Sequence, residues 1–374
     1  MAIKDMFVID AVVHAIDNSY EQIVHSKFAA EVIFQDRASQ FDMLPADYVI
    51  DEQRFYQKFP KDGLLSLVYR ESATDMAVYH AVPMYGVFDD YSPLSVGQAM
   101  KHEYPGRTMV YGPLSTFYGV QAAIDELDRL VEQEKVDGIK FYPWDMIDGK
   151  SRTMSLADEQ EVYPVLQHAL DLGMTHIAVH KSLPLGIAPT DAYRIGDVDH
   201  AARDFPDIQF EVVHTGNAFL EDHVWQVSRF KNVWANLEVT AMYAMNHPRK
   251  FARIMGELLL AGAEDRMLYS SGASWAHPQP IIEALVDFEM PASMVDEGYP
   301  EFTDTIKEKI LGLNYARLHG IDIAERKRLT ENDDIEIEKR AHGLAAPWSG
   351  TPVPAPSAPE VYEEAMLIKS RSSF

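Results

Sequence analysis

Two short apolar runs, His176-Ile-Ala-Val-His180 and Ile208-Gln-Phe-Glu-Val-Val-His214, decide how this sequence is interpreted. Both are mostly apolar without strict alternation, which is typical of strands that are buried on both faces of a parallel sheet. Both also end on a histidine. Helix-like patterns separate runs of this kind along the chain, and this alternation indicates repeated βα units.

Six more runs share this character, and helix-like patterns such as Gln121–Gln133, Asp158–Leu172 and Arg249–Ala261 lie between them. The eight predicted strands are Phe7–His14, Met76–Val82, Thr108–Gly112, Gly138–Tyr142, His176–His180, Ile208–His214, Val233–Val239 and Met267–Ser271. They predict a closed (β/α)8 TIM barrel of the α/β class, and the 374 residues suffice for one. An open doubly wound sheet is the alternative, but no G-x-G-x-x-G or P-loop motif opens a helix to support it.

The predicted barrel occupies residues 1–321, and its last helix, 303–321, ends at Gly320. Residues 15–75 are an insertion after the first strand, which we expect to cover the barrel mouth. Residues 322–374 are a C-terminal extension that becomes Pro-rich beyond about residue 343, and proline favours extended structure. Trp348, Tyr362 and Leu367 give it apolar anchors, so an arm across a partner subunit and a disordered tail both stay open.

Composition limits the chemistry. The chain has no cysteine, so any metal must be bound by His, Asp, Glu or a modified Lys, a ligand set that suits Zn, Fe, Mn or Ni. The formal net charge of −25 argues against nucleic acid and anionic membranes as partners. No apolar run is long enough to span a membrane, and the N-terminus lacks the apolar segment of a secretory signal, so we expect a cytoplasmic protein.

Four histidines, His14, His80, His180 and His214, fall at or near the ends of predicted strands. In a (β/α)8 barrel the carboxyl ends of the strands converge on the active-site face. A single histidine is more often a core or surface residue, but neutral imidazole is a common metal ligand. Four histidines placed in this way therefore predict a metal centre at the barrel mouth.

Several short segments follow one another in a specific order: Val-Ile-Asp-Ala-Val-Val-His (8–14), Asp-Gly-Ile-Lys-Phe-Tyr-Pro (137–143), Ile-Ala-Val-His (177–180), Phe-Glu-Val-Val-His-Thr-Gly (210–216), Met-Leu-Tyr-Ser-Ser-Gly (267–272) and Ile-Leu-Gly-Leu-Asn-Tyr-Ala-Arg-Leu (310–318). Together they resemble the amidohydrolase-related branch that includes aminocarboxymuconate-semialdehyde decarboxylase. The resemblance implies a metal-dependent barrel with a D-x-H-x-H motif on the first strand, a histidine on the fifth, another on the sixth, and an aspartate after the eighth.

Two positions depart from that pattern. Val12 stands where the first motif histidine is expected, and Gly272 stands where the aspartate is expected. Valine cannot bind a metal, and glycine has no carboxylate to act as a base. An inactive structural paralogue is one interpretation. The other is a rebuilt site that holds two metals with the ligands His14, Glu71, His80, His180, His214 and His277.

This replacement pattern resembles an atypical dinuclear subgroup of the same superfamily. The subgroup includes the thioacid-forming hydrolase of platensimycin-type pathways and the two-component, oxygen-dependent 2-aminoisobutyrate hydroxylase. The overall character of the chain, including its extended tail, is most similar to a subunit of the latter. The resemblance implies a dinuclear Fe or Mn/Fe centre, dioxygen as co-substrate, a small amino or carboxylic acid as substrate, and a homologous partner subunit in an oligomer.

Lys140 and Glu238 lie on the predicted fourth and seventh strands and are candidate catalytic residues. Lys140 could bind a substrate carboxylate or, if carbamylated, bridge two metals; the structural alternative is a buried pair with a carboxylate such as Glu238. Glu238 could orient a histidine ligand, as carboxylates near metal sites often do. It could also replace the missing aspartate as general base, with His277 as the other candidate.

Three hypotheses for the function follow. The first is oxygen-dependent hydroxylation of a small amino or carboxylic acid at the dinuclear centre, and it is favoured by the altered ligand set. The second is hydrolysis or decarboxylation of a small acid at a single metal such as Zn, whose bound water would be the nucleophile. The third is a non-catalytic partner subunit of a paralogous enzyme.

Overall fold

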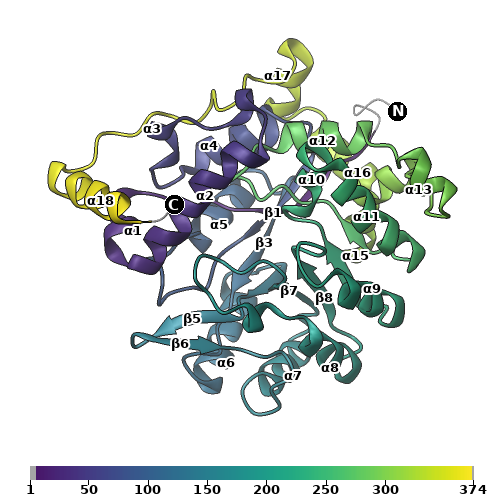
Figure 1. Cartoon of the computed structure of the whole chain (residues 1–374), viewed down its shortest axis with the longest axis horizontal. Helices are drawn as coiled ribbons and strands as arrows, with labels where there is room; N and C mark the ends of the chain where they lie inside the picture. The colour runs from purple at the N-terminus through teal and green to yellow at the C-terminus, as the bar shows by residue number, and fades with distance from the viewer. Residues whose placement is uncertain (1–5, 373–374) are drawn as a thin grey trace.

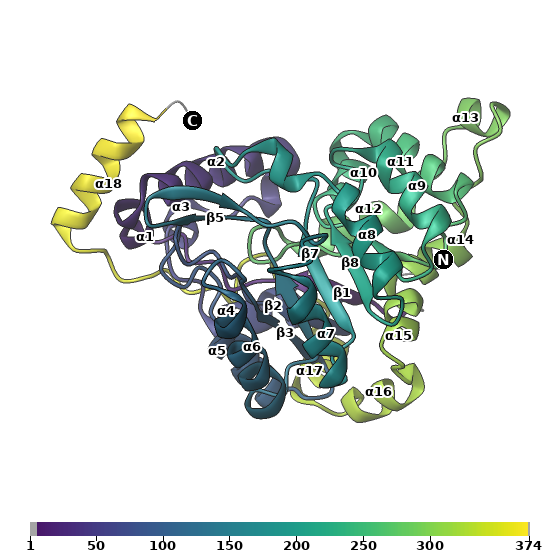
Figure 2. The same ribbon diagram turned by 90° about the horizontal axis from the view of Figure 1, so that it is seen from below.

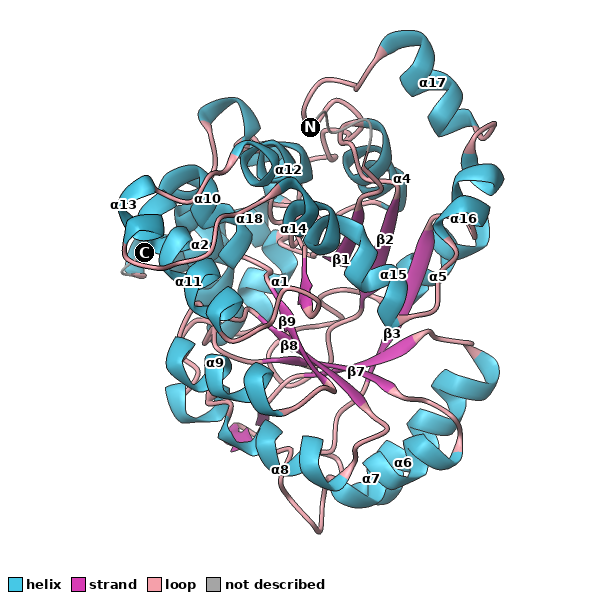
Figure 3. Ribbon diagram, turned by 90° about the vertical axis from the view of Figure 1, so that its right-hand side faces the viewer, coloured by secondary structure: helices cyan, strands magenta, loops and turns pink. Residues whose placement is uncertain are grey.

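The computed structural model describes residues 6–372, so the first five residues, used above to argue against a secretory signal, lie outside it. Its main sheet has eight strands, all parallel, in the order β1-β2-β3-β4-β7-β8-β9-β10. They are β1 (Ile9–Val13), β2 (Met76–His80), β3 (Thr108–Pro113), β4 (Gly138–Phe141), β7 (His176–His180), β8 (Gln209–Val213), β9 (Val233–Asn236) and β10 (Met267–Leu268). The prediction of a (β/α)8 barrel is confirmed, because strands and helices alternate around this sheet (Figures 1 and 3).

The sheet closes between its first and last strands. The backbone N–H of Ala11 in β1 donates to Tyr269 just after β10 at 3.0 Å, and the N–H of Gly272 donates to Val12 at 3.1 Å. Val13 also forms a parallel bridge with Ala273. The loop after β10 therefore completes the barrel and lies directly against the strand end that carries His14.

The helices pack outside the barrel and over one of its ends. They are α1 (Tyr20–His25), α2 (Lys27–Met43), α3 (Glu52–Phe55), α4 (Lys61–Leu65), α5 (Leu94–Glu103), α6 (Val120–Asp128), α7 (Tyr163–Asp171), α8 (Gly196–Asp204), α9 (Leu220–Arg229), α10 (Tyr243–Asn246), α11 (Pro248–Leu260), α12 (Pro278–Asp287), α13 (Ala292–Asp296), α14 (Asp304–Glu308), α15 (Asn314–Leu318), α16 (Ile323–Thr330), α17 (Asp334–His342) and α18 (Pro359–Arg371). The predicted helix 303–321 corresponds to α14, one π turn and α15.

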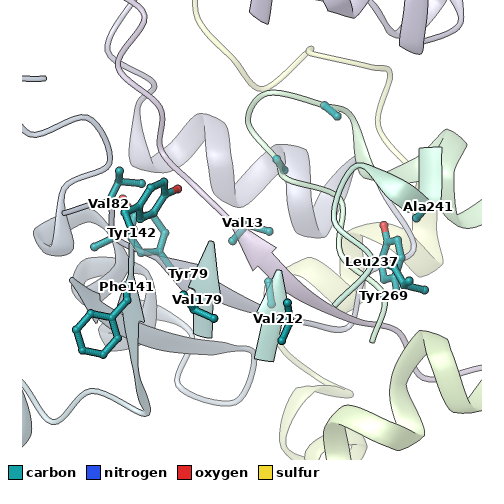
Figure 4. Close-up of a cluster of buried hydrophobic side chains, with 14 of the residues drawn as sticks. Val13, Tyr79, Val82, Phe141, Tyr142, Val179, Val212, Leu237, Ala241 and Tyr269 are labelled. Carbon is teal, nitrogen blue, oxygen red and sulfur yellow. The ribbon is translucent and has the colours of Figure 1, made fainter. Parts of the chain in front are cut away.

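Helix α11 shows why these segments are helical. It begins with Pro248, whose fixed φ suits the first helical position. Phe251, Ile254, Met255 and Leu258 recur every three or four residues and are buried against the barrel. Apolar side chains from several strands, such as Val13, Val179 and Val212, belong to one continuous core together with helix residues such as Ile254 and Met255 (Figure 4).

An antiparallel hairpin, β5 (Trp144–Ile147) and β6 (Lys150–Thr153), follows β4 and was not predicted. Its two-residue turn is Asp148-Gly149, and both residues have positive φ. Asp-Gly at such a turn is a recognised hairpin signal. The side chain of Asp145 in β5 accepts a hydrogen bond from the backbone N–H of Gly86, which holds the hairpin against the loop after β2.

The C-terminal extension contains more helix than its composition predicts. Helices α16 and α17 precede an extended segment, and α18 follows it and packs against α1 and α2 of the insertion (Figure 2). We call residues 344–352 the strap, because the backbone N–H of Ala345 donates to Arg70 and Arg54 donates to Thr351. None of the helices in residues 6–372 combines the length and apolar character that a bilayer-spanning segment needs.

Candidate active site

Four side chains meet at the carboxyl ends of the barrel strands. His14 follows β1, His180 ends β7, His214 follows β8, and Glu238 lies two residues beyond β9. All four are buried and line one cavity of about 250 Å³. Helix α2 lines the other side of this cavity, so the insertion does lie beside the barrel mouth.

Backbone carbonyls fix which nitrogen of each ring carries the proton. Nδ1 of His14 lies 2.7 Å from the carbonyl oxygen of His80, Nε2 of His180 lies 2.8 Å from that of Leu183, and Nδ1 of His214 lies 3.3 Å from that of Glu238. A carbonyl oxygen can only accept, so each of these nitrogens is protonated. The second nitrogen of each ring is therefore left with a lone pair.

Two of these nitrogens lie next to each other, and two lie next to a carboxylate. Nδ1 of His180 lies 3.2 Å from Nε2 of His214, which lies 3.5 Å from Oε2 of Glu238. Nε2 of His14 lies 3.8 Å from Oε1 of Glu238. Unprotonated nitrogens and carboxylate oxygens all carry lone pairs, so they repel one another at such distances unless a cation lies between them.

These separations fit a metal site. Two ligand atoms on a tetrahedral metal with bonds of about 2.0–2.1 Å lie roughly 3.3 Å apart. Within residues 6–372, Oε2 of Glu238 has no hydrogen-bond partner, as expected of an atom directed at an ion. No group of three or more His, Asp or Glu side chains in that range is arranged to hold a metal ion as it stands, so the pairwise spacings alone carry this fit.

Burial keeps the three rings neutral. It lowers the pKa of His14 to about 3, with the nearby charge of Lys140 acting in the same direction. The pKa values of His180 and His214 fall well below the usual range for the same leading reason. Neutral imidazole is the metal-binding form, so these environments favour coordination at neutral pH.

Glu238 takes the space that an aspartate at position 272 would need. Gly272 has φ +71°, and a Cβ added to it would lie 2.8 Å from Oε1 of Glu238. Burial raises the pKa of Glu238 to about 7, although the ammonium of Lys140 opposes this shift. A carboxylate that follows the neighbouring strand β9 thus lies where the side chain of an aspartate at position 272 would begin. Val12, the other departure, is fully buried in the apolar interior of the barrel.

Lys140 lies on β4 and is fully buried. Within residues 6–372 its ammonium has no hydrogen-bond partner. Burial lowers its pKa to about 8, and the charges of Glu238 and Glu211 oppose that shift. The structural alternative, a buried pair with Glu238, is thus met only as an electrostatic interaction, because no hydrogen bond joins the Lys140 ammonium to that carboxylate.

His80, at the end of β2, lies next to the cluster rather than in the cavity wall. Its ring stacks on Tyr111 with centroids 4.6 Å apart and meets the His14 ring edge-on at 6.2 Å. Within residues 6–372, neither of its ring nitrogens has a hydrogen-bond partner.

Glu71 and His277 lie together, but elsewhere. Oε2 of Glu71 is 3.5 Å from Nε2 of His277, and neither residue lines the cavity. The Glu71 carboxylate accepts hydrogen bonds from the backbone N–H groups of Trp348 at 2.6 Å and Gly350 at 2.8 Å. His277 caps α12 by accepting from the N–H of Gln279. The structure thus pairs these two predicted ligands with each other and with the strap, apart from His14, His180 and His214.

Sequence reasoning missed the side chains that shape the cavity. Tyr142, Tyr243 and Trp275 supply aromatic walls, and Asp36 and Met43 come from α2. The ring of Tyr142 lies 4.5 Å from that of His180. Tyr142 follows Lys140 by two residues, so its place on the same strand end was a usable signal.

Comparison with solved structures supports the fold. An uncharacterised TIM-barrel protein from Bordetella bronchiseptica is 13% identical, with a TM-score of 0.59, and the match covers 84% of this chain and 99% of that one. A 2,6-dihydroxybenzoate decarboxylase from Rhizobium is 14% identical, with a TM-score of 0.53 and coverage of 85% and 99%. A 5-carboxyvanillate decarboxylase from Novosphingobium aromaticivorans, complexed with manganese, is 13% identical, with a TM-score of 0.52 and coverage of 84% and 96%.

No curated protein matches the sequence significantly. The family model described as Amidohydrolase, however, matches residues 96–321, which is more than half of the chain and contains every strand from β3 to β10. With the barrel and the histidines at its strand ends, this match shows that the chain belongs to the amidohydrolase family.

Proposed function

We propose that this protein is a metal-dependent enzyme that hydrolyses or decarboxylates a small carboxylic acid, with one divalent metal ion held by His14, His180 and His214. The observation that carries the proposal is the pair of unprotonated nitrogens of His180 and His214, 3.2 Å apart, with the unprotonated nitrogens of His214 and His14 both next to the Glu238 carboxylate. Each ring is oriented by a hydrogen bond to a backbone carbonyl, which is how proteins commonly hold imidazole ligands. Three protein ligands also leave a position for water or substrate.

When bound there, a divalent metal polarises a substrate oxygen and lowers the pKa of a water molecule. Glu238 lines the same cavity, so its carboxylate can accept a proton from water or substrate and return it to the leaving group. Lys140 adds a positive charge that offsets Glu238 and a substrate carboxylate. The aromatic walls keep bulk water away from the reacting group.

Metal titration tests the proposal. Full-length protein, freed of metal with a chelator, is titrated with Zn²⁺ and with Mn²⁺ in a calorimeter. We expect about one site per chain, and at least ~100-fold weaker metal binding for His180→Ala or His214→Ala. Even substitution of a residue that only hydrogen-bonds to a metal ligand lowers metal affinity about 10–100-fold. His200→Ala, on the exposed side of α8, is the control. Absence of a site in the native protein, or unchanged binding in both variants, would refute the proposal.

A second candidate is oxygen-dependent hydroxylation at a dinuclear Fe or Mn/Fe centre. One observation favours it: both nitrogens of His80 lack partners within residues 6–372, and its ring lies beside that of His14. It ranks second because Glu71, the carboxylate expected to bridge two ions, is held by the strap. Two equivalents of iron or manganese, loss of one in His80→Ala, and consumption of dioxygen would establish it. The homologous partner subunit expected with it stays a prediction.

A further inference from the structure

A chain of buried polar side chains crosses the barrel from the site toward its opposite end. Glu211 on β8 is fully buried and accepts a hydrogen bond from the hydroxyl of Tyr111 on β3. Its other oxygen accepts from Nδ2 of Asn236 at 3.3 Å. The side-chain oxygen of Asn236 in turn accepts from the backbone N–H of Glu238 at 3.3 Å. Hydrogen bonds thus connect the loop that carries Glu238 to Tyr111.

His319, just after α15, extends this chain to the surface. Its Nε2 lies 2.8 Å from the hydroxyl oxygen of Tyr111. Because the Tyr111 proton is donated to Glu211, this nitrogen must carry its own proton and donate it to Tyr111. His319 also lines a pocket of about 330 Å³ at the amino-terminal end of the barrel, together with exposed residues such as Gly320 and Glu325. We call this the basal pocket.

The residues around Glu211 and His319, the two ends of this route, determine how readily each of them holds a proton. Lys140 on β4 stabilises the negative charge of Glu211, and the phenols Tyr111 and Tyr315 contact each other beside it. The His319 ring stacks on Tyr315 at 4.7 Å and on His176 at 3.9 Å. Burial raises the pKa of Glu211 to about 7 and lowers that of His319 well below its usual range. Glu211 can therefore gain and lose a proton near neutral pH, whereas His319 stays neutral.

A buried carboxylate with a purely structural role would need hydrogen-bond donors, but it would not need a path for protons to the surface. Here every donor between the basal pocket and Glu211 is a group that can both give and receive a proton. We propose that protons reach Glu211 from the basal pocket through His319 and Tyr111. This route lets the Glu211 carboxylate beside Lys140 gain or lose its proton even when a ligand fills the cavity at the opposite end of the barrel.

The transfer is balanced in protons and involves no change of oxidation state. One proton enters at Nδ1 of His319, another leaves Nε2 for the phenol oxygen of Tyr111, and the phenol proton moves to Oε1 of Glu211; release follows the reverse order. His319 and Tyr111 are then positioning residues that act through Glu211. The inference rests on the proposed function only in that Lys140 serves the reacting group.

Carbon NMR of the full-length protein, labelled with ¹³C at the glutamate carboxyl groups, tests the inference. The Glu211 signal is identified by its loss in Glu211→Gln and followed from about pH 5 to about pH 9. We expect one averaged signal in the native protein. His319→Phe keeps the aromatic stack but removes both proton-carrying nitrogens, so proton exchange at Glu211 should slow at least ~tenfold and broaden or split the signal. Tyr111→Phe should act in the same way.

Tyr315→Phe is the matched control, because Tyr315 donates to the same phenol at 3.2 Å but is a buried side branch of the chain. It should leave the exchange unchanged. The inference is overturned if Glu211 does not titrate, if both His319→Phe and Tyr111→Phe exchange as the native protein does, or if Tyr315→Phe slows exchange equally. Metal content, measured on the same samples, reports separately on the proposed function.

Discussion

Replacing Glu71 with alanine should release the strap without removing the metal. The carboxylate is fully buried and accepts from Ser66 Oγ at 2.8 Å as well as from the backbone of Trp348 and Gly350. A hydrogen bond to a charged group contributes about 1.5–3 kcal/mol, so loss of the two backbone bonds alone costs about 3–6 kcal/mol. Since each 1.4 kcal/mol is about tenfold, local opening of residues 344–352 should become at least ~100-fold more frequent.

Hydrogen–deuterium exchange measured by mass spectrometry is the assay, because it resolves the strap from the barrel. Glu71→Gln keeps one acceptor and should show an intermediate effect. Glu364→Ala, at an exposed position of α18, is the control and should exchange as the native protein does. If Glu71→Ala loses metal while the strap stays protected, Glu71 is a metal ligand and the anchoring argument is wrong.

Three further predictions concern other parts of the chain. Deleting residues 343–374 should shift the protein to a smaller species in size-exclusion chromatography if the extension is an inter-subunit arm; an unchanged elution volume would contradict that role. Gly272→Asp should cost about 2 kcal/mol in urea unfolding, through positive φ and contact with Glu238. Adding Glu238→Gly should recover part of that loss. If the two changes in unfolding free energy simply add, the side chains at 272 and 238 do not compete for the same space. Glu211 is protonated up to about pH 7 in the folded protein but only to about 4.5 when unfolded. Folding stability should therefore fall by up to about 3 kcal/mol as pH rises through that window, and Glu211→Gln should lack this component. A stability difference from the native protein that stays constant with pH would refute it.

The barrel strands could be predicted because each is a short apolar run buried on both faces, and each begins and ends within three residues of the predicted bounds. The hairpin after β4 was missed because all of β6 is exposed and polar, although its Asp148-Gly149 turn carried a signal. Helix α18 was missed because the preceding prolines dominate that stretch, yet its own first residue, Pro359, is favourable for starting a helix.

The candidate site could be predicted only in part. His14, His180 and His214 were found because strand ends in a barrel converge, a rule that needs no knowledge of distant contacts. The placement of Glu71 depends on a partner 277 residues away in the sequence, and no local pattern encodes such a pairing. Polar residues such as Glu211 and Tyr111 look like ordinary strand residues until the barrel brings them face to face.

The pairing of Glu71 with the strap also bears on how the molecule is made. Glu71 lies in the first fifth of the sequence, and Trp348 and Gly350 lie in its last tenth. A ribosome must therefore finish almost the entire polypeptide before this contact can form, while the N-terminal segments wait for their partners. A chain truncated before residue 344 by an early stop codon or by proteolysis would keep all three histidines of the cluster. Its insertion would, however, lack the hydrogen bonds to the strap. Only full-length molecules would then stabilise the insertion, which lines one side of the cavity, through the strap.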